Sequence, residues 1–205
     1  MKIAVIGAGR VGRALASGLT DAGHTVAIAV RDPASPGACS AAADGLPVLP
    51  LAWAGDDADV VVLAVPHAAI PEVLGAIGGD PVIVDASNNL ETGPAGPRPS
   101  GVTGADLVIA GRPGARVVKA FNTIGWEHLA GARFPAPGAA MPLCGTVPTA
   151  REVVATLASD LGFTPVDLGG IAQAVALEHL AAMWVKLSLD RGRDFAFAVV
   201  DGHVE

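Results

Sequence analysis

The sequence predicts an α/β protein with a Rossmann-type, doubly wound and mostly parallel sheet, followed by a small α/β C-terminal extension. Two observations support this prediction. Short β-branched apolar runs alternate with helical patterns over the first two-thirds of the chain, as in a parallel sheet covered on both faces. The first apolar run breaks into Gly7-x-Gly9-x-x-Gly12 directly before an amphipathic segment, and this strand–turn–helix order is typical of a dinucleotide-binding turn.

We expect strands where a short, nearly all-apolar run is bounded by turn residues, because strands buried on both faces lose the alternation of polar and apolar side chains. The expected strands are residues 2–6, 25–30, 47–50, 60–65, 82–85 and 117–121, with helices over 11–22, near 53–57 and over 68–77. Residues 88–101 are rich in Gly and Pro, which predicts a surface loop, and a short helix is expected around 105–111.

Beyond residue 121 the alternation continues more loosely. Strands are expected over 141–145 and 163–168, a helix over 148–161 with Pro148 in its first turn, and a long helix over 171–189. The apolar stripe of this last helix is wide for a surface helix, so we expect it to face a second subunit as well as the sheet. We divide the chain into a Rossmann domain, 1–122, and a smaller α/β portion, 123–205, which packs on it and completes the substrate cleft.

Composition narrows the class of protein. Hydrophobic residues make up 51% of the chain and charged residues 16%, which predicts a substantial core, and no apolar run is long enough to span a membrane. Met1-Lys2 leads directly into the first strand without a signal-peptide pattern, so we expect a cytoplasmic protein. The net charge of −7 argues against a nucleic-acid partner. The absence of tyrosine excludes the short-chain dehydrogenases, which need a catalytic Tyr.

The two cysteines point to neither a disulfide nor a metal site. Cys39, in an expected loop, and Cys144, in an expected strand, lie far apart in the sequence, and neither has a neighbour of the metal-binding type. We therefore expect two free thiols and no metal.

Each glycine of the N-terminal turn is expected to have its own task. Gly7 permits the sharp turn, Gly9 lets the backbone approach a pyrophosphate, and Gly12 lets the helix pack against the strand. The N-terminus of the following helix offers free N–H groups and a partial positive charge to the phosphates. The residues between the glycines, which line the same turn, are Ala8, Arg10 and Val11.

The end of the second strand indicates which dinucleotide binds. An acid that accepts from the ribose of NAD normally stands there, but this strand ends in Val30-Arg31-Asp32. Val30 cannot accept a hydrogen bond from its side chain, whereas the planar fork of Arg31 can pair with a 2′-phosphate. Arg10 could approach the same phosphate from the other side. We therefore favour NADP over NAD, and the preference reverses if Asp32 rather than Arg31 faces the ribose.

Two further segments are expected at the ligand-binding edge. Leu63-Ala64-Val65-Pro66-His67 ends a strand in small apolar residues, which places flat backbone beside the ribose and nicotinamide. An isolated histidine such as His67 is more often a surface or capping residue than a catalytic one. The polar run Asp85-Ala-Ser87-Asn88-Asn89 follows another strand, at the side of an open α/β sheet where ligands bind.

The run Val117-Val-Lys-Ala-Phe-Asn-Thr123, preceded by Pro113-Gly-Ala, resembles the coenzyme F420-dependent NADP oxidoreductase family. These are NADPH-dependent F420 reductases with an NADP-binding domain like that of pyrroline-5-carboxylate reductase. The other segments that agree with the family are the opening glycines, Arg31-Asp32-Pro33, Ala64-Val-Pro66, Leu177-Glu-His-Leu180 and residues 192–197. The resemblance therefore covers essentially the whole chain.

The resemblance implies hydride transfer between NADP(H) and the deazaflavin coenzyme F420 in a compact homodimer. It implies roles for several residues: Gly7, Ala8, Gly9, Arg10, Val11 and Gly12 at the pyrophosphate, Arg31 at the 2′-phosphate, Ala64, Val65, Pro66 and His67 at the ribose and nicotinamide, and Asn122 and Thr123 closing the pocket of the second ring system. Ser87, in the polar run that follows a strand, is also expected to bind the cofactor. Transfer between stacked rings needs proximity and alignment more than a proton donor. We therefore assign no catalytic residue, and the nearest candidates are His67 and Asn122.

Other functions remain open at this point. An NADPH-dependent reductase of a carbonyl would need an acid for the developing alkoxide, and the candidates are His67, Lys119 and Asp85. Lys119 ends a buried strand, where we favour a structural or phosphate-neighbouring role. Trp126 and Trp184 offer the large aromatic faces, although both fit a core or an interface equally well. Reduction of an imine, quinone or flavin, and a non-catalytic NADP(H)-binding module, are the remaining alternatives.

Overall fold

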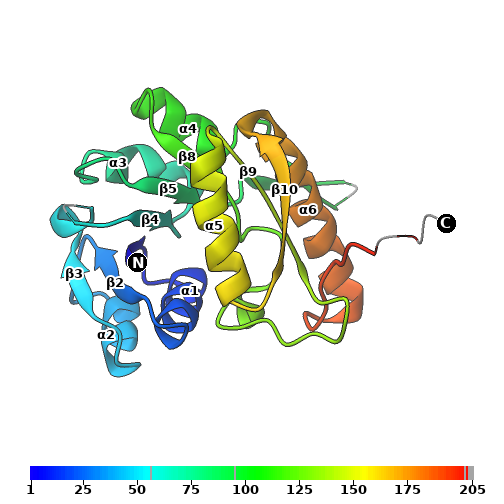
Figure 1. Ribbon diagram of the computed structural model, residues 1–205, viewed down its shortest axis with the longest axis horizontal. Coiled ribbons are helices and arrows are strands. Elements are labelled where there is room, and N and C mark those ends of the chain that lie inside the picture. Colours follow the sequence, from blue (N-terminus) through cyan, green and yellow to red (C-terminus); the bar gives the residue numbers. More distant parts are fainter. Residues whose placement is uncertain (56, 95, 201, 203–205) are drawn as a thin grey trace.

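The computed structural model describes residues 1–55, 57–94, 96–200 and 202. They contain an eight-stranded sheet with the strand order β10-β9-β8-β5-β4-β1-β2-β3 (Figure 1). Six strands from β3 to β8 run parallel to one another, which is the 3-2-1-4-5-6 order of a doubly wound dinucleotide-binding sheet. The next strand, β9, pairs antiparallel with β8, and β10 runs parallel to β9. The predicted Rossmann-type, mostly parallel fold is confirmed.

The bounds of the elements follow the predicted ones closely along most of the chain. The strands of this sheet are β1 (Lys2–Ile6), β2 (Thr25–Val30), β3 (Val48–Pro50), β4 (Val60–Leu63), β5 (Val82–Asp85), β8 (Arg116–Lys119), β9 (Ala140–Gly145) and β10 (Thr164–Gly170). The helices are α1 (Arg10–Asp21), α2 (Pro36–Ala43), α3 (Ile70–Leu74), α4 (Gly104–Gly111), α5 (Pro148–Asp160) and α6 (Ala174–Arg191). Single 3-10 turns are η1 (Leu51–Trp53), η2 (His67–Ala69), η3 (Trp126–His128) and η4 (Ile171–Gln173).

Helices cover both faces of the sheet. On one face α1, α2 and α5 pack their buried side chains, such as Leu15 and Val154, against the strands, and Figure 1 shows α5 crossing that face. On the other face α3, α4 and the first turn of α6 contribute Val73, Val108 and Leu177. The central strands are therefore buried on both sides, which explains why their sequences are almost entirely apolar.

The structure corrects two of the predicted elements. The helix expected near residues 53–57 is wrong: the chain forms only the 3-10 turn η1, and residue 56 lies outside the described residues. The loop expected over residues 88–101 contains a hairpin, β6 (Leu90–Gly93) and β7 (Gly96–Pro99), in which Glu91 lies opposite Arg98 and forms an ion pair of 2.9 Å. The Gly and Pro content predicted a loop, but the Glu91–Arg98 pair across the two strands stabilises an antiparallel hairpin.

Helix α2 was missed altogether. Its sequence signal is Ser35 at the N-cap position followed by Pro36 in the first turn, both of which favour a helix start. The helix carries the exposed Cys39, so the expectation that this cysteine lies in a loop is also wrong.

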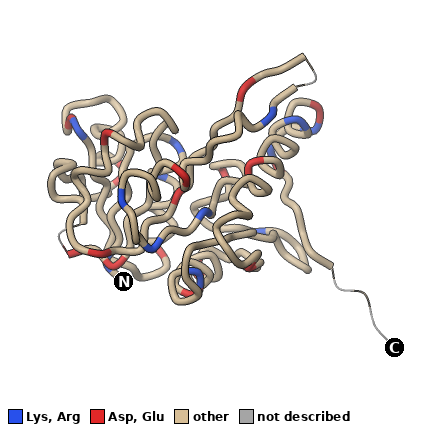
Figure 2. The backbone as a smooth tube through the Cα atoms, turned by 90° about the horizontal axis from the view of Figure 1, so that it is seen from above, with Lys and Arg blue, Asp and Glu red and all other residues tan. Residues whose placement is uncertain are grey.

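Beyond β8 the chain extends the same sheet and then crosses it with α6. The β6–β7 hairpin projects from the body of the molecule beside α6 (Figure 2). None of the helices in the described ranges combines the length and the apolar character needed to cross a membrane.

Candidate functional site

The candidate site lies along the carboxyl ends of the parallel strands, where the chain leaves each strand in succession. Three backbone hydrogen bonds extend the sheet past its last paired residues: Ala64 N to Ile6 O (2.9 Å), Ala86 N to Leu63 O (3.2 Å) and Ala120 N to Asp85 O (3.2 Å). These bonds fix the segments that follow β4, β5 and β8 relative to the glycine turn after β1. The edge is therefore held rigidly by the backbone.

The glycine turn has the tight geometry that its sequence predicts. Gly7 adopts a φ of 114°, and a Cβ there would lie 2.5 Å from the carbonyl oxygen of Ala64. A Cβ on Gly12 would run into the carbonyl oxygen of Gly7. A Cβ on Gly9 would meet no atom within 4 Å, because this residue faces open space at the start of α1. Two of the glycines are thus required by packing, and the third leaves room for a ligand.

No side chain caps the N-terminus of α1. Gly9 is the N-cap residue and has no side chain, so the first N–H groups of the helix point into the open space without a side-chain acceptor. A helix N-terminus of this kind binds phosphate through its N–H groups and the positive end of its dipole.

A cavity of about 370 Å³ lies between the glycine turn and the ends of β2 and β3. Its charged lining residues are Arg31 and Asp32. The predicted residues that it brings together are Gly7, Ala8, Gly9, Arg31 and Val65, and those that sequence reasoning missed are Ser35, Gly37, Leu51 and Val73. A Cβ on Gly37 would lie 2.7 Å from the carbonyl oxygen of Ala8, so the unpredicted helix α2 packs directly on the glycine turn.

The two charged residues of this cavity are oriented differently. Asp32 accepts a hydrogen bond from the backbone N–H of Ala34 at 2.8 Å through Oδ1, as an aspartate that stabilises a turn does. Arg31 donates from Nη1 to both carboxylate oxygens of Glu72 on α3, at 2.8 and 2.9 Å. Arg31 is thus the cation of the cavity, and Asp32 is engaged in local turn structure.

Arg10 does not join Arg31. Its guanidinium lies over the ring of Trp126 on η3, 5.5 Å from the ring centroid. Arg10 therefore connects the start of α1 to the segment after β8, whereas Arg31 faces α3. Trp126 is half-buried, and its contact with Arg10 places it beside the start of α1.

Ala64, Val65, Pro66 and His67 follow β4 as predicted, with Val65 in the cavity wall and His67 at the first position of η2. His67 is half-buried, and among the described residues its Nε2 finds no hydrogen-bond partner. The Nε2 atom is itself buried, so it is an unsatisfied buried polar group at the end of the segment after β4.

A buried ion cluster lies where β5, β8 and α6 meet. The ammonium of Lys119 donates to Asp85 Oδ2 (2.9 Å) and to the carbonyl oxygen of Ser87 (2.9 Å), and it lies 3.0 Å from Glu178 Oε1. The side chains of Lys119 and Asp85 are fully buried, and that of Glu178 is 1% exposed. The ammonium is thus paired on all sides and has a structural role, consistent with the role that we favoured for Lys119.

Asp85 and Glu178 use their remaining oxygens to hold loops. Asp85 Oδ1 accepts from the hydroxyl (2.6 Å) and the backbone N–H (3.0 Å) of Ser87, so the Ser87 side chain is engaged within the protein. Glu178 Oε2 accepts from the backbone N–H of Asn89 at 2.9 Å. The cluster therefore fixes the segment after β5 against α6. Sequence reasoning assigned no role to Glu178, and no local signal shows that it meets Lys119.

The segment after β8 carries a strained backbone and polar groups without partners. Phe121 is buried with a φ of 67°, a conformation that a bulky residue rarely adopts. Asn122 donates to Asn88 Oδ1 (3.0 Å) and to the carbonyl oxygen of Leu177 (3.3 Å). Within the described chain Asn122 Oδ1 and Thr123 Oγ1 have no partner. Strained residues and orphaned polar groups are typical of functional segments.

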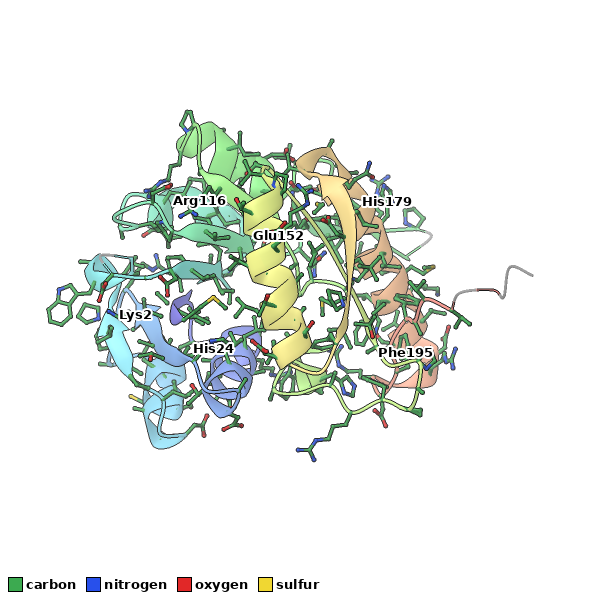
Figure 3. The ribbon with its side chains drawn as sticks, viewed as in Figure 1. Lys2, His24, Arg116, Glu152, His179 and Phe195 are labelled. Carbon is green, nitrogen blue, oxygen red and sulfur yellow. The ribbon has the colours of Figure 1, made fainter. Side chains whose placement is uncertain are left out.

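Trp126 and Trp184, the two tryptophans considered as aromatic faces for a ligand, differ in exposure. Trp184 is buried, stacks on Phe195 at 5.0 Å between ring centroids, and donates from Nε1 to the carbonyl oxygen of Phe195 at 3.2 Å. Figure 3 shows Phe195 beside the last turns of α6. Trp184 is therefore a core residue, and the half-buried Trp126 is the aromatic side chain next to the glycine turn.

Glu127, beside Trp126, pairs with Arg193 at 2.5 Å. Partial burial by itself would raise the pKa of the Glu127 carboxyl, but the hydrogen bonds from Arg193 and the backbone and the nearby positive charges hold it below its usual value. This carboxylate is thus ionised and engaged at neutral pH.

The two cysteines lie apart in the structure, one exposed and one buried. Cys39 and Cys144 are free thiols, as predicted, and burial raises the pKa of the Cys144 thiol to about 11. Among the described residues, no three His, Cys, Asp or Glu side chains come together in a way that could hold a metal ion.

The sheet order, the glycine turn and the cavity with its arginine define a dinucleotide-binding Rossmann protein. The sequence profile described as "NADP oxidoreductase coenzyme F420-dependent" matches residues 2–89. A hypothetical protein from Sinorhizobium meliloti is 37% identical, with 84% of this chain and 86% of that chain covered and a TM-score of 0.71. The chain belongs to the coenzyme F420-dependent NADP oxidoreductase family.

Two further relatives differ in what their names state. A candidate F420-dependent NADP-reductase from Arthrobacter sp. FB24 is 29% identical, with a TM-score of 0.83, and 98% of this chain and 100% of that chain are covered. The metalloreductase STEAP3 of Rattus norvegicus is 29% identical over 188 residues, which are 87% of this chain. The chain spans only 36% of the length of that relative.

Proposed function

We propose that this protein transfers hydride between NADP(H) and coenzyme F420, with the nucleotide bound along the glycine turn and the Arg31 cavity. The observation that supports this most strongly is the open space at Gly9 beside the uncapped N-terminus of α1, together with an arginine in the adjoining cavity. The name of the Arthrobacter relative, whose whole chain is covered, supports F420 as the second substrate.

The residues present fit an NADP(H) molecule. The first N–H groups of α1 would receive the pyrophosphate at Gly9, and the Arg31 guanidinium would receive the 2′-phosphate at the far end of the cavity. The segments after β4 and β8, with the orphaned Nε2 of His67 and Oδ1 of Asn122, would border the nicotinamide. Asp32 is engaged with Ala34, which supports NADP over NAD because it leaves Arg31 as the group that meets the ribose.

Bound NADPH would supply a hydride from nicotinamide C4 to C5 of the deazaflavin, and solvent would supply the accompanying proton. The protein's own contribution is to orient the two rings and exclude water. The Lys119 cluster fixes the segment after β5 against α6, and the hydrogen bonds of Asn122 to Asn88 and Leu177 fix the segment after β8. Such alignment lowers the barrier without an acid or base side chain.

The test is a spectrophotometric assay with NADPH and oxidised F420. We expect loss of the deazaflavin absorbance with wild-type protein and a much lower rate with Gly9→Ala, because the added Cβ enters the space of the pyrophosphate. Confirmed NADPH binding without any turnover of F420 would contradict F420 as the substrate.

A second candidate is NADPH-dependent reduction of a different acceptor. It is favoured by the 29% identity with a metalloreductase and by His67, whose Nε2 has no partner among the described residues and could donate a proton to a reduced substrate. Lys119 does not serve this purpose, since its ammonium is paired and fully buried. Turnover with a flavin or a small ketone that is lost in His67→Ala, without F420 turnover, would favour this candidate.

A further inference from the structure

The arginine that the proposed function assigns to the 2′-phosphate is already paired in this structure. Arg31 Nη1 lies 2.8 and 2.9 Å from the two carboxylate oxygens of Glu72. We propose that Glu72 is a specificity-determining residue of the nucleotide site. Glu72 competes with the 2′-phosphate for Arg31. The ratio of NADPH affinity to NADH affinity is therefore lower than it would be if Arg31 had no carboxylate partner. The inference rests on the proposed function, since it takes the Arg31 cavity as the nucleotide site.

The position of Glu72 at the rim of the cavity supports this role. Its neighbour on α3, Val73, lines the same cavity as Arg31. The side chain of Glu72 is 58% exposed and that of Arg31 is 64% exposed, so the pair is screened by water and weakly held. A phosphate, which binds the arginine fork through two oxygens with a higher charge, can therefore replace the carboxylate. The exposed Glu72 side chain can turn to solvent when this happens.

The charges around Arg31 show why the replacement carries a cost. Glu72 is the carboxylate that Arg31 contacts, and Asp32, the other charged residue of the cavity lining, adds a second negative charge to this region. A 2′-phosphate dianion that approaches Arg31 meets the negative charge of Glu72 at short range. Two unit charges about 4 Å apart in water repel one another enough to change a binding constant by roughly fivefold.

NADH lacks the 2′-phosphate, so it leaves the Arg31–Glu72 pair in place. The proposal therefore predicts an effect that is confined to the phosphorylated nucleotide. A residue that only stabilised α3 would change the affinity for both nucleotides alike.

The experiment is isothermal titration of NADPH and NADH, with 2′,5′-ADP and 5′-AMP as the matching fragments. The proteins are wild type, Glu72→Gln, Arg31→Ala and the double variant. Glu91→Gln is the matched control, because Glu91 is also an exposed acid paired with an arginine, Arg98, at 2.9 Å. In Glu72→Gln we expect NADPH and 2′,5′-ADP to bind about three- to tenfold more tightly, with NADH and 5′-AMP within about twofold of wild type.

The double variant tests whether Glu72 acts through Arg31. In the Arg31→Ala background, Glu72→Gln is expected to change NADPH affinity by about twofold or less. The Glu91→Gln control is expected to match wild type for all four ligands.

Two results overturn the inference, and they are distinguishable. If Arg31→Ala weakens NADPH selectively but Glu72→Gln leaves the ratio of the NADPH and NADH affinities within twofold of wild type, the inference fails while the proposed site stands. If Arg31→Ala weakens neither nucleotide, or NADPH does not bind, the proposed site fails and the inference fails with it.

Discussion

The two halves of the candidate site, at the carboxyl edge of the sheet, are built by different means. On the β1–β2 side, the site consists of backbone: a glycine turn, an uncapped helix start and one exposed arginine. On the β5–β8 side, it is held by buried side chains, above all the Lys119 cluster, which connects residues up to 93 positions apart in the sequence (Asp85 and Glu178). The first half is suited to bind the phosphates of a nucleotide, as the glycine turn and helix N-terminus do in dinucleotide-binding proteins of this fold. The second half sets a rigid wall whose details depend on distant contacts.

This comparison predicts that a substitution in the second half lowers the free energy of unfolding much more than it lowers the affinity for the nucleotide. In Lys119→Met, two carboxylates stay buried without their cation, so we expect the free energy of unfolding to fall by about 3–5 kcal/mol. Urea unfolding measures this change, and NADPH titration at low urea should show affinity within a few-fold of wild type. Lys186→Met serves as the control, because Lys186 is an exposed lysine of α6, the helix that carries Glu178, and this change should leave stability nearly unchanged. A loss of less than about 1 kcal/mol in Lys119→Met would show that the cluster contributes little net stability.

A substitution in the first half should lower the affinity for NADPH and leave the stability of the fold nearly unchanged. In Gly9→Ala we expect the fold to stay intact, since the added Cβ meets nothing within 4 Å, and the affinity for NADPH to fall by roughly 10- to 100-fold. Thermal unfolding and fluorescence titration measure the two properties. Gly75→Ala is the matched control, because its Cβ also meets nothing and it lies outside the cavity. A lower unfolding temperature with unchanged affinity in Gly9→Ala would reverse the assignment.

Within the first half, Arg31 should discriminate between nucleotides. In Arg31→Ala we expect NADPH to bind about 10- to 100-fold more weakly, since hydrogen bonds to a charged group contribute about 1.5–3 kcal/mol each, while NADH changes by threefold or less. The titration also includes Arg133→Ala as a control, because Arg133 is exposed and lines no part of this cavity. Equal losses for both nucleotides would place Arg31 away from the 2′-phosphate.

The smallest effect concerns the two cysteines, Cys39 on α2 and Cys144 on β9, the strand that pairs with β8. Burial raises the pKa of the Cys144 thiol to about 11, so this thiol stays protonated and shielded at pH 8, whereas Cys39 is exposed on α2. We expect a thiol reagent at pH 8 to modify one cysteine in the folded protein and both in denaturant. In Cys39→Ser the folded protein should show no rapid reaction. Rapid modification of Cys144 in this variant would mean that β9 opens readily.

The two halves also differ in how far their structure could be predicted from the sequence. The glycine turn and Arg31 were predicted because each depends on residues close together in the chain, where spacing alone carries the geometry. The Lys119–Glu178 contact could not be predicted, since it forms only when α6 crosses the sheet. The pairing of Arg31 with Glu72 was missed because it also joins residues far apart in the sequence, and it forms only when α3 packs beside the end of β2.

Local errors have local physical causes. Gly and Pro between residues 88 and 101 masked a hairpin that the Glu91–Arg98 pair stabilises across its strands. The start of α2 carried the Ser-Pro signal of a helix N-terminus, but its short, alanine-rich sequence has no apolar periodicity. The homodimer stays a prediction; Val175 and Met183 of α6 are exposed as it requires, at 39% and 49%.

The measurement that tests the account most directly is a crystal structure of the protein with NADP⁺. The account predicts the pyrophosphate at the N–H groups after Gly9, the 2′-phosphate on Arg31 with Glu72 displaced, and the nicotinamide between the segments after β4 and β8. A nucleotide bound elsewhere, or bound at the glycine turn with Arg31 still paired to Glu72 and the 2′-phosphate in solvent, would contradict it.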